Sequence, residues 1–473
     1  MERSEEEDPQ HTIERLCSLS APLTNQFVKV DLSKKVPTFC KNALTFNIYL
    51  SFFLILLAFP LWIIISCSQI KYPFEDLNEE VRSGLIGGAS ALLGLDVIWL
   101  LYSLRLVFRG GLPCTMPSPP PHAPTFPTSA SRPAQHVALK HVYIIKNGAS
   151  GKNYGDKILN DILLPRLHAE NITHTVLPTR YPAHAYDYAH NLPLDNVDAL
   201  IVIGGDGSLM ETVTGLLSRP DKRRIPIGLI PGGTGNSFSA DAGCWDVAAA
   251  VERIIAGQVV SVDANHVRDE GDLDLYSINV VALGLIGDVA VTAETARWLG
   301  GARYDACGLW ALLKNAKLTM RLEYEDADGQ VTVLDRPVVT AFVSHTQYFG
   351  KGLRAAPKAA LDDGFADITI CTDLSRAQML EVFAQLPLGA HGNQIYDNII
   401  QKPVRRCVMQ VRPTDTAADA APDSVAEGVV NVDGEMFAYR GAITVECVPE
   451  AFQLFAPADA RAVDARALGG VKM

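Results

Sequence analysis

The sequence predicts an α/β domain with a parallel sheet, followed by a C-terminal antiparallel β-sandwich domain and preceded by an N-terminal membrane helical hairpin. Three observations lead to this architecture. Residues 137–257 alternate apolar, strand-like runs with helical runs, a pattern typical of a helix-covered parallel sheet. Short apolar runs separated by Asp-Gly turns then continue to about residue 456, as in antiparallel sandwiches. Near the N-terminus, residues 48–65 contain no charged side chain.

Length and composition narrow the class of protein. A chain of 473 residues is too long for one hydrophobic core, so several modules are expected. Apolar residues make up 48% and charged residues 20%, which excludes a wholly disordered or collagen-like chain. The formal net charge of -12 argues against DNA or RNA as the main partner. The nine cysteines form no C-x-x-C pair, so neither a zinc site nor a disulfide framework is expected.

The membrane hairpin is predicted over residues 44–109, after a mobile tail at 1–43. As a helix, the uncharged run would rise about 27 Å and nearly cross a bilayer core. A buried core helix is the alternative, but the run has no polar stripe. The second segment, residues 85–108, contains Asp96, which is costly in lipid and leaves a re-entrant or interfacial helix open. Basic residues at the outer ends predict that both termini lie in the cytosol.

A Pro-rich linker at 110–136 leads into the predicted α/β domain at 137–257, the sandwich at 258–456 and a tail at 457–473. In the α/β domain, strands are expected at 137–147, 197–205 and 225–231, and helices at 156–168, 208–217 and 246–256. In the sandwich, strand-like runs lie at 259–267, 275–284, 318–325, 337–346, 366–372 and 429–448, with helices near 292–313 and 376–385. Residues 413–425 are an acidic, low-complexity insertion.

The strongest local signal is the segment GGDGSLMETVTGLL at 204–217, where an apolar strand is followed by an amphipathic helix. Open α/β sheets bind their ligands at such strand ends. Glycines let backbone amides approach a polyphosphate, and the helix N-terminus adds positive potential. Asp206 could therefore orient or deprotonate an attacking hydroxyl, although an Asx turn or a helix N-cap would equally explain it.

Two more glycine-containing loops follow predicted strands. PGGTGNSFS at 231–239 ends the next strand, so one nucleotide could bridge it and the first loop; capping of a turn is the alternative role for Asn236. NGASGKNYG at 147–155 offers Ser150 and Lys152 to phosphate, but without the spacing of a Walker loop. No H-R-D loop followed by D-F-G is present, which excludes a protein kinase of the usual kind.

Together these segments resemble the diacylglycerol kinase catalytic-domain superfamily, which includes sphingosine, ceramide and bacterial lipid kinases. GGDG alone also occurs in phosphofructokinases and NAD kinases. The ordered set is specific: NGASGKNYG, TRYPAHA, GGDGSLMETVTGLL, PGGTGNSFS, RWLGGARYD, APKAALDDGFAD and VDGE, from about residue 140 to 455. The resemblance implies a kinase that uses ATP and Mg²⁺ to phosphorylate the primary hydroxyl of a sphingolipid, either ceramide or a sphingoid base. A diacylglycerol kinase is the alternative.

The resemblance also implies site residues. Asp206 matches the proton donor and acceptor of sphingosine kinases, and Glu435 of VDGE matches the base of the bacterial enzymes; the choice between them stays open. The implied ATP-binding residues are Asn147, Ser150, Gly151, Lys152, Thr179, Gly204, Gly205, Gly207, Glu211, Gly233, Thr234, Gly235, Asn236, Arg297, Arg303, Asp433 and Gly434. Solvated helix charges are the alternative for the two arginines, and an ordinary hairpin turn for Asp433-Gly434.

A metal site is implied at Asp363 in LDDGFAD. The bacterial relatives hold a structural magnesium at the matching position together with backbone carbonyls, here those of Ala360 and Phe365. A hairpin turn is the alternative there too.

The sequence departs from the family pattern at two positions. The aspartate that contacts sphingosine would fall on Ala290, and not on Asp288, so a counter-ion for a sphingoid amine is missing. RWLGGARYDACGL looks more like ceramide kinase, whose substrate has no free amine, although the Cys-rich C-terminal segment of that enzyme is absent. Gly148 stands where many members have proline, which should loosen the first loop.

A lipid substrate gives the hairpin a function, because a tether would hold the site close to the bilayer. The expected location is an endomembrane, of the ER or Golgi, with the kinase domain facing the cytosol; the oligomeric state is open. Two other classes of protein share parts of this pattern. A soluble NAD kinase shares GGDG, but the PGGTGN loop and the hairpin argue against it. A membrane-anchored, non-catalytic lipid-binding protein is disfavoured because all three glycine loops and both acids are present.

Overall fold

The computed structural model describes residues 135–147, 154–233, 235–244, 246–295, 317–349, 353–386, 396–412 and 427–456, with residues 307, 308, 311 and 314 in addition. All of them belong to one compact unit. The predicted tails, the membrane hairpin and nearly all of the Pro-rich linker lie outside these residues. Within the described part of the chain, no helix combines the length and the apolar character needed to cross a membrane.

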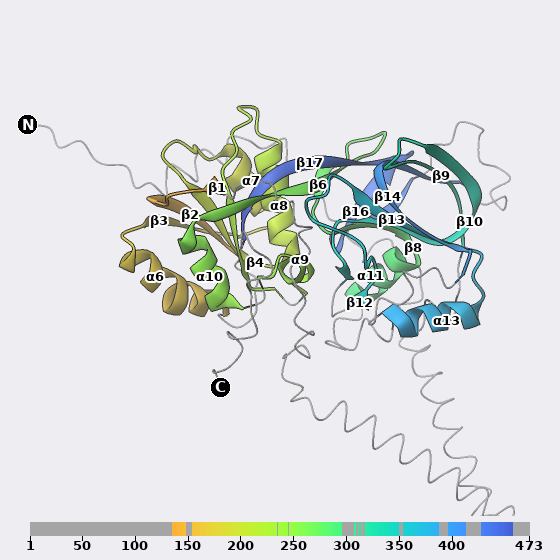
Figure 1. Ribbon diagram of the computed structural model, residues 1–473, viewed down its shortest axis with the longest axis horizontal. Coiled ribbons are helices and arrows are strands. Elements are labelled where there is room, and N and C mark those ends of the chain that lie inside the picture. Colours follow the sequence, from red (N-terminus) through yellow and green to blue (C-terminus); the bar gives the residue numbers. More distant parts are fainter. Residues whose placement is uncertain are drawn as a thin grey trace, which may run out of the picture. The chain divides into compact units, whose positions relative to one another are not determined.

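A parallel sheet forms the first part of the described chain (Figure 1). Its strands are β2 (His141–Lys146), β3 (Thr173–Pro178), β4 (Ala199–Gly204) and β5 (Ile227–Pro231). They lie in the order β3-β2-β4-β5, with every pair parallel. β3 is therefore added on one side of β2, and β4 and β5 are added on the other side, so the strand order reverses between β2 and β4. Open α/β sheets bind ligands outside the carboxyl ends of the strands at such a switch point.

Helices cover both faces of this sheet. One face carries α5 (Tyr154–Lys157), η2 (Ile158–Leu163), α6 (Leu164–Ala169) and α10 (Val247–Ala256). The other face carries α7 (His184–Asn191) and α8 (Asp206–Leu217), and the short α9 (Ser237–Asp241) follows β5. Alternate residues of β4 supply the two cores, because Leu200 and Val202 pack with α7 and α8 while Ile201 and Ile203 pack with the opposite layer.

The second part of the described chain is built from antiparallel strands. These are β6 (Gln258–Arg268), β7 (Asp274–Ser277), β8 (Val280–Gly284), β9 (Leu318–Asp326), β10 (Val331–Ser344), β11 (Tyr348–Phe349), β12 (Leu353–Arg354), β13 (Ala366–Thr372), β14 (Ile399–Val411), β15 (Glu427–Val432), β16 (Glu435–Arg440) and β17 (Ile443–Phe455). It also contains the helices α11 (Leu285–Thr295) and α13 (Arg376–Gln385) and the short β1 (Gln135–His136), which pairs with β6.

The two parts share a continuous sheet. The long strand β17 pairs antiparallel with β14 and β6, and its Leu454 pairs in parallel with Ile227 of β5 (Figure 1). The predicted combination of a parallel α/β sheet and an antiparallel sandwich is therefore confirmed. The pairing of β17 with β5 joins the two parts into one sheet.

Some helices and strands begin and end where the sequence predicted, and others do not. The helix expected at 376–385 is observed over those residues, and α10 begins after Asp246, whose side chain accepts the amide hydrogen of Ala249 at 2.8 Å. α8 begins two residues before its predicted start, at Asp206. The run at 275–284 is two strands, since the chain turns between β7 and β8. The helix expected from residue 292 already begins at Leu285. β1, β3, β11, β12, β14, α7 and α9 were not predicted.

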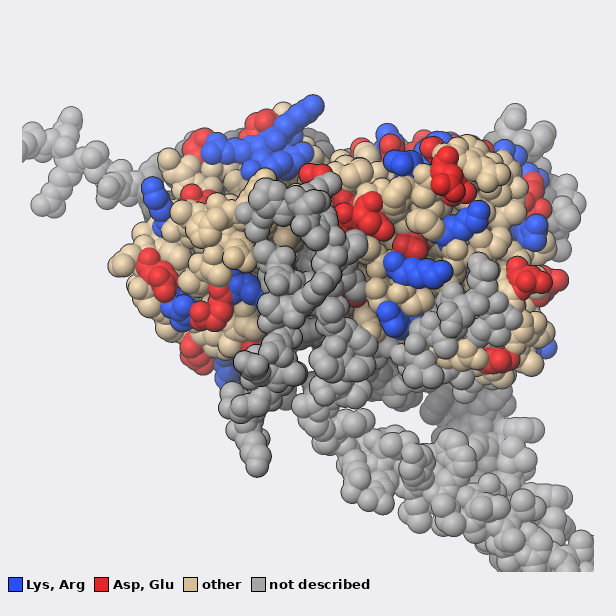
Figure 2. All heavy atoms as spheres, in the orientation of Figure 1, with Lys and Arg blue, Asp and Glu red and all other residues tan. Residues whose placement is uncertain are grey.

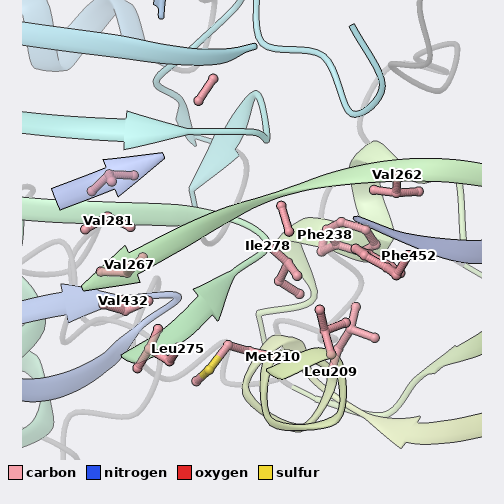
Figure 3. Packing of buried hydrophobic residues seen from close by; sticks show 14 of the residues in the cluster. Leu209, Met210, Phe238, Val262, Val267, Leu275, Ile278, Val281, Val432 and Phe452 are labelled. Atoms are coloured by element: carbon pink, nitrogen blue, oxygen red, sulfur yellow. The ribbon is translucent and has the colours of Figure 1, made fainter. Parts of the chain in front are cut away.

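A shared core fixes the starts of α8 and α9. Figure 3 shows Leu209 of α8 facing Phe238 of α9 and Phe452 of β17, whereas Met210 of α8 lies beside Leu275 of β7. The rings of Phe238 and Phe452 lie 6.3 Å apart between centroids. Fully burying an aromatic or branched aliphatic side chain stabilises a fold by about 1.5–3 kcal/mol. Packing in this core therefore fixes the residues that begin both helices.

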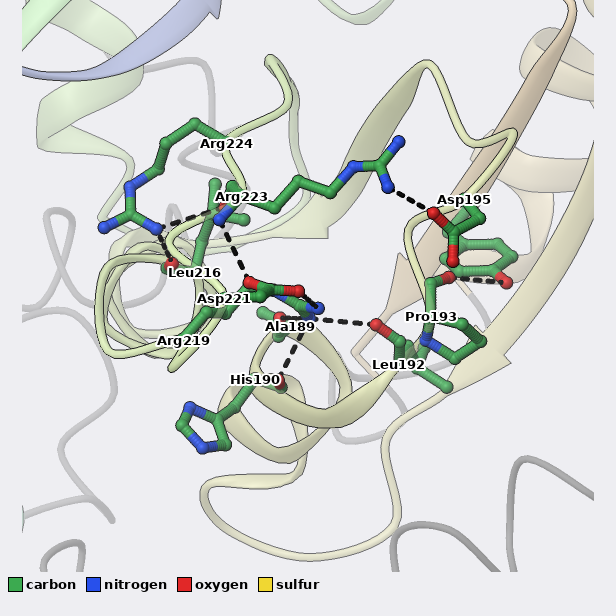
Figure 4. A network of polar contacts seen from close by, with 11 residues as sticks. Ala189, His190, Leu192, Pro193, Asp195, Leu216, Arg219, Asp221, Arg223 and Arg224 are labelled. Carbon is green, nitrogen blue, oxygen red and sulfur yellow. Dashed lines mark hydrogen bonds and ion pairs between the residues drawn. The ribbon is translucent and has the colours of Figure 1, made fainter.

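Arginines satisfy the carbonyl groups at the far ends of α7 and α8 (Figure 4). The buried Arg219 donates from one guanidinium nitrogen to the carbonyls of Ala189, His190 and Leu192 at 2.9 to 3.0 Å. Arg224 donates to the carbonyls of Leu216 and Leu217. Basic side chains gather over this end of the two helices (Figure 2). The last carbonyls of a helix have no partner within it, so these contacts stabilise both helix ends.

We expect Arg219→Ala to destabilise the fold by about 3 kcal/mol, which lowers the melting temperature by roughly 6–12 °C. The reason is that three carbonyl groups lose a charged donor in a buried position. Thermal unfolding followed by circular dichroism measures the change. Arg223→Ala is the matched control: its ion pair with Asp195 is exposed, so the cost should stay below about 1 kcal/mol. Equal melting temperatures for the two variants would contradict the helix-end role of Arg219.

Candidate functional site

The carboxyl ends of β2, β4 and β5 bring two of the predicted loops and Asn147, the first residue of the third, to one edge of the sheet. Lys146 pairs with Ile203, and Gly204 pairs with Pro231. Just beyond the strands, the amide of Asn147 donates to the carbonyl of Ile203 at 3.1 Å, and the amide of Gly232 donates to that of Gly204 at 2.8 Å. The predicted loop residues thus meet at the switch point between β2 and β4.

The loops that follow β4 and β5 are packed against each other. A Cβ atom on Gly233 would lie only 2.6 Å from the Cα atom of Gly205, so neither position has room for a side chain. Asn236, with a left-handed φ of 51°, closes the second loop. Its Nδ2 donates to the carbonyl of Gly233 at 2.8 Å, and its Oδ1 accepts the amide hydrogen of Gly233 at 3.1 Å. Asn236 therefore shapes the loop through its own side chain.

We expect Gly233→Ala to reduce activity by at least about tenfold, because the methyl group would force the two loops apart and a misplacement of about 1 Å can cost on the order of 100-fold in rate. Gly329→Ala is the control. Gly329 is exposed in the turn between β9 and β10, and no atom lies within 4 Å of the position of a Cβ there, so activity should be nearly unchanged. Steady-state rates at saturating substrate compare the two. Equal rates would show that loop packing does not matter.

Asp206 is the first residue of α8, and α9 holds its carboxylate. Oδ2 accepts the amide hydrogen of Ser237 at 2.8 Å, and Oδ1 accepts that of Phe238 at 3.2 Å. Burial raises the pKa of Asp206 to about 6, although both amide hydrogen bonds act in the opposite direction. A carboxylate in a fixed orientation with a pKa near neutrality is suited to accept a proton from a substrate hydroxyl.

Glu435 reaches the same place from the sandwich. It is the first residue of β16, and its Oε1 lies 3.2 Å from the position that a Cβ atom would take on Gly207. The carboxylate of Glu435 therefore lies beside Gly207 in the first turn of α8, and Gly207 directly follows Asp206 in the sequence. Two acids from different parts of the fold meet at the N-terminus of one helix, where backbone amides and the helix dipole favour negative charge.

Asp433 anchors the β15–β16 hairpin that carries Glu435. With φ values of 52° and 89°, Asp433 and Gly434 form the tight turn of the β15–β16 hairpin, as the Asp-Gly pair predicts. The carboxylate of Asp433 is buried and accepts hydrogen bonds from Ser277 Oγ and from the amides of residues 278, 279 and 280, at 2.7 to 2.9 Å. Burial raises its pKa to about 6. These contacts are structural, and the ATP contact implied for Asp433 stays a prediction.

Three further implied ATP residues lie along the same edge. Asn147 Nδ2 donates to Ser208 Oγ at 3.1 Å, and the amide of Thr179 donates to the carbonyl of Lys146 at 2.9 Å. Glu211 Oε1 accepts the amide hydrogen of Ala183, whose φ is 68°, at 3.0 Å. Glu211 thereby fastens the loop after β3 to α8. Ser150, Gly151, Lys152, Thr234, Arg297 and Arg303 lie outside the described residues.

The implied metal position at Asp363 offers one carboxylate. Asp363 is exposed, and its Oδ1 accepts the amide hydrogen of Phe365 at 3.0 Å. Backbone groups of Ala360 and Phe365 face the ring of His345, and burial lowers the pKa of that imidazole to about 4. The part of the chain that the structure describes contains no group of three or more His, Cys, Asp or Glu side chains arranged to hold a metal ion. Magnesium at Asp363 stays a prediction.

A third acid near the site was not predicted. Asp241 is the last residue of α9 and only 2% exposed, and its Oδ2 accepts the amide hydrogens of Gln347 and Tyr348 at 2.7 and 3.3 Å. Burial raises its pKa to about 7, and the charge of Asp206 adds to this rise. Asp241 thus links the α/β part to β11. The signal in the sequence was a lone acid in the small, apolar segment SFSADAG.

Comparisons with known proteins agree with these features. The family model "Diacylglycerol kinase catalytic domain" matches residues 141–267, and "YegS C-terminal NAD kinase beta sandwich-like domain" matches residues 279–456. Sphingosine kinase 1 of Arabidopsis thaliana is 26% identical over 360 residues, which cover 67% of this chain and 72% of the relative. Human ceramide kinase is 27% identical over 192 residues, or 37% of this chain and 36% of that one.

A solved structure shares the fold. The crystal structure of a candidate diacylglycerol kinase from Bacillus anthracis superposes with a TM-score of 0.51 at 22% sequence identity, and the match covers 67% of this chain and 97% of that chain. The two matched family models follow one another along the chain and together span both parts of the fold and the site between them. The chain therefore belongs to the diacylglycerol kinase catalytic-domain superfamily of lipid kinases.

Proposed function

We propose that this lipid kinase transfers the γ-phosphate of ATP to the primary hydroxyl of a sphingolipid, and that ceramide is favoured over a free sphingoid base. The observation that carries the proposal is the meeting of Asp206 and Glu435 at the N-terminus of α8, beside two glycine loops that pack against each other. Diacylglycerol is the alternative acceptor, because its primary hydroxyl is chemically similar.

Phosphate binding and proton transfer are carried out by different residues of the site. The amides of the loop after β4 and of the first turn of α8 would hold the phosphates, because the amides of Gly232 and Gly233 already donate within the protein. The hydroxyl oxygen of the lipid attacks the γ-phosphorus, the bond to the β,γ-bridging oxygen breaks, and ADP leaves. The hydroxyl proton passes to a carboxylate, which we assign to Asp206 because two amides fix its orientation. Glu435 would then lie on the side of the γ-phosphate from which the lipid hydroxyl approaches.

Magnesium fits the same place. Carboxylate oxygens are the ligands that Mg²⁺ prefers, and Glu435 brings one carboxylate to the end of the phosphate-binding loops, which leaves Asp206 as the base. The ion, when bound with ATP, would neutralise charge on the β- and γ-phosphates. In phosphoryl transfer, positioning and neutralisation of charge supply most of the rate enhancement.

The preference for ceramide rests on the sequence of α11. Ala290 stands where the resemblance to sphingosine kinases requires an aspartate, so this helix brings no carboxylate for a free amine at that position. The amide nitrogen of ceramide carries no charge and needs no counter-ion. The likenesses to a sphingosine kinase and to a ceramide kinase support a sphingolipid in general.

We further propose that residues 44–109 tether the kinase to an endomembrane, of the ER or Golgi, with the catalytic part in the cytosol. Support comes from the sequence: one uncharged run of 18 residues and a second apolar segment precede the Pro-rich linker. A tether would keep the site near lipid that never leaves the bilayer.

Labelled ATP offered with micelles of ceramide, sphingosine or diacylglycerol tests the function, with the lipid products separated by chromatography. The expected result is a labelled ceramide phosphate, formed faster than the other products. Preferential labelling of diacylglycerol would establish the alternative. Formation of NADP from NAD, or nucleotide binding with no labelled lipid from any acceptor, would overturn the proposal.

A further inference from the structure

Three aromatic rings are stacked at the start of α7. The rings of Tyr181 and His184 lie 4.0 Å apart between centroids at an interplanar angle of 12°, and those of His184 and Tyr188 lie 4.0 Å apart at 23°. His184 and Tyr188 are buried, whereas 44% of Tyr181 is exposed. His184 covers one face of Tyr181, and Tyr181 still exposes 44% of its surface. The stack therefore includes an aromatic ring that solvent reaches.

Hydrogen bonds hold every ring of this stack in place. Tyr181 Oη donates to Asp187 at 2.9 Å, and Tyr188 Oη donates to the carbonyl of Pro178 at 3.1 Å. His184 Nδ1 accepts the amide hydrogen of Arg180 at 3.1 Å, so the proton of the neutral ring lies on Nε2. Pro182 restricts the backbone of the tyrosine before it. A planar ligand that stacks on Tyr181 would meet an ordered surface.

The stack lies on the same sheet edge as the phosphate-binding loops. Lys146 of β2 pairs with Pro178 of β3 on one side and with Ile203 of β4 on the other. Neighbouring strands are about 4.8 Å apart, so Thr179 after β3 and Gly204 at the end of β4 are separated by about 10 Å. That separation matches the ribose and phosphates of an extended nucleoside triphosphate. Glu211 also fixes the loop after β3 to α8, at Ala183.

The direction of the nucleotide follows from the position of the acids. Glu435 comes from the sandwich, and β5 is joined to the sandwich by β17, so the acceptor lipid must approach from that side. The γ-phosphate then points toward Asp206 and Glu435. The base lies at the other end, past β2, where the loop after β3 carries the aromatic stack.

From this juxtaposition we infer that Tyr181 stacks on the purine base of the bound nucleotide, with His184 and Tyr188 as its support. The inference rests on the nucleotide site of the proposed function and adds the group that holds the base. Aromatic rings stack on any nucleobase, so Tyr181 supplies affinity and orientation without selecting adenine over guanine.

Binding of Mg-ADP to the full chain, measured by titration calorimetry, tests the inference without any lipid. We expect Tyr181→Ala to raise the Kd for ADP by about tenfold and that for GDP by a similar factor, since stacking of one base on an aromatic ring is lost. Inorganic tripolyphosphate, which has no base, should bind the variant and the wild type equally. Tyr181→Phe keeps the ring and should bind ADP like the wild type, and Tyr181→Trp should bind it at least as tightly.

Each other outcome has a distinct meaning. Unchanged ADP binding by Tyr181→Ala would overturn the base contact and leave the kinase proposal intact. Equal weakening of ADP and tripolyphosphate would also overturn it, because the effect would then be structural. Failure of the wild type itself to bind ADP would overturn both the inference and the proposed function.

Discussion

Asp206→Asn is expected to lower the rate of lipid phosphorylation by at least about 100-fold while the protein still binds Mg-ATP. An amide cannot take up the proton of the lipid hydroxyl. In addition, the side-chain amide of the variant has a single oxygen that could accept a hydrogen bond from α9, so one of the two backbone amides of Ser237 and Phe238 would lose its partner. Rates with saturating ATP and lipid, together with the Kd of ADP, separate loss of catalysis from loss of binding.

Two variants serve as comparisons. Asp246→Asn makes the same change at an exposed carboxylate that accepts a backbone amide at the start of α10, remote from the site, and should leave the rate unchanged. Glu435→Gln should also reduce turnover. If Glu435→Gln abolishes activity and Asp206→Asn keeps most of it, the base is Glu435 and our assignment is wrong.

The pH dependence of the rate follows from the pKa of Asp206. Burial raises this pKa from 3.8 to about 6, so the carboxylate is ionised above pH 6 and protonated below it. A base must be ionised to accept a proton. The rate should therefore fall about tenfold per pH unit below about pH 6 and level off above about pH 7. A rate that stays constant down to pH 5 would exclude Asp206 as the base.

Asp433→Ala is expected to destabilise the fold by roughly 4 kcal/mol, which lowers the melting temperature by roughly 8–16 °C. The substitution removes the acceptor of four hydrogen bonds and leaves the amides of residues 278, 279 and 280 unpaired in a buried position. The cost of burying the carboxylate, which appears as its raised pKa, is relieved and limits the loss. Urea or thermal unfolding measures the difference.

The neighbouring residue offers a control for this prediction. Gly434 has a φ of 89° and no atom within 4 Å of the position of a Cβ, so Gly434→Ala introduces backbone strain and no clash. Its cost should be about 1–2 kcal/mol. If Asp433→Ala is no more destabilising than Gly434→Ala, then the buried carboxylate does not hold the β7–β8 connection, and its support of Glu435 through the hairpin is also in doubt.

Much of the fold could be predicted because buried parallel strands are continuous apolar runs, as in ALIVIG of β4 and IGLIP of β5. β3 was missed because it is the edge strand and its segment THTVLP is mostly half-buried, with no apolar run. α7 was missed because HAYDYAHN is rich in polar groups, although His184 and Asp187 are buried through hydrogen bonds and stacking. Such burial depends on tertiary contacts.

The glycine loops were predictable because a phosphate can approach the backbone closely only where glycine leaves room, whatever the rest of the fold. The partners of the acids were not. Asp433 contacts Ser277, 156 positions away along the chain, and Asp206 is held by amides of α9, a helix too short to show a periodic pattern. Long-range pairings of this kind leave no trace in local sequence. The division between Asp206, which we propose as the base, and the structural Asp433 therefore required the three-dimensional arrangement.

A crystal structure with Mg²⁺ and a non-hydrolysable ATP analogue would test the central claim most directly. We predict β- and γ-phosphates between the loops at 204–207 and 232–235, with the γ-phosphate beside Asp206 and Glu435 and the base over the loop after β3. A nucleotide bound at another face, or one whose γ-phosphate points away from both acids, would contradict the account.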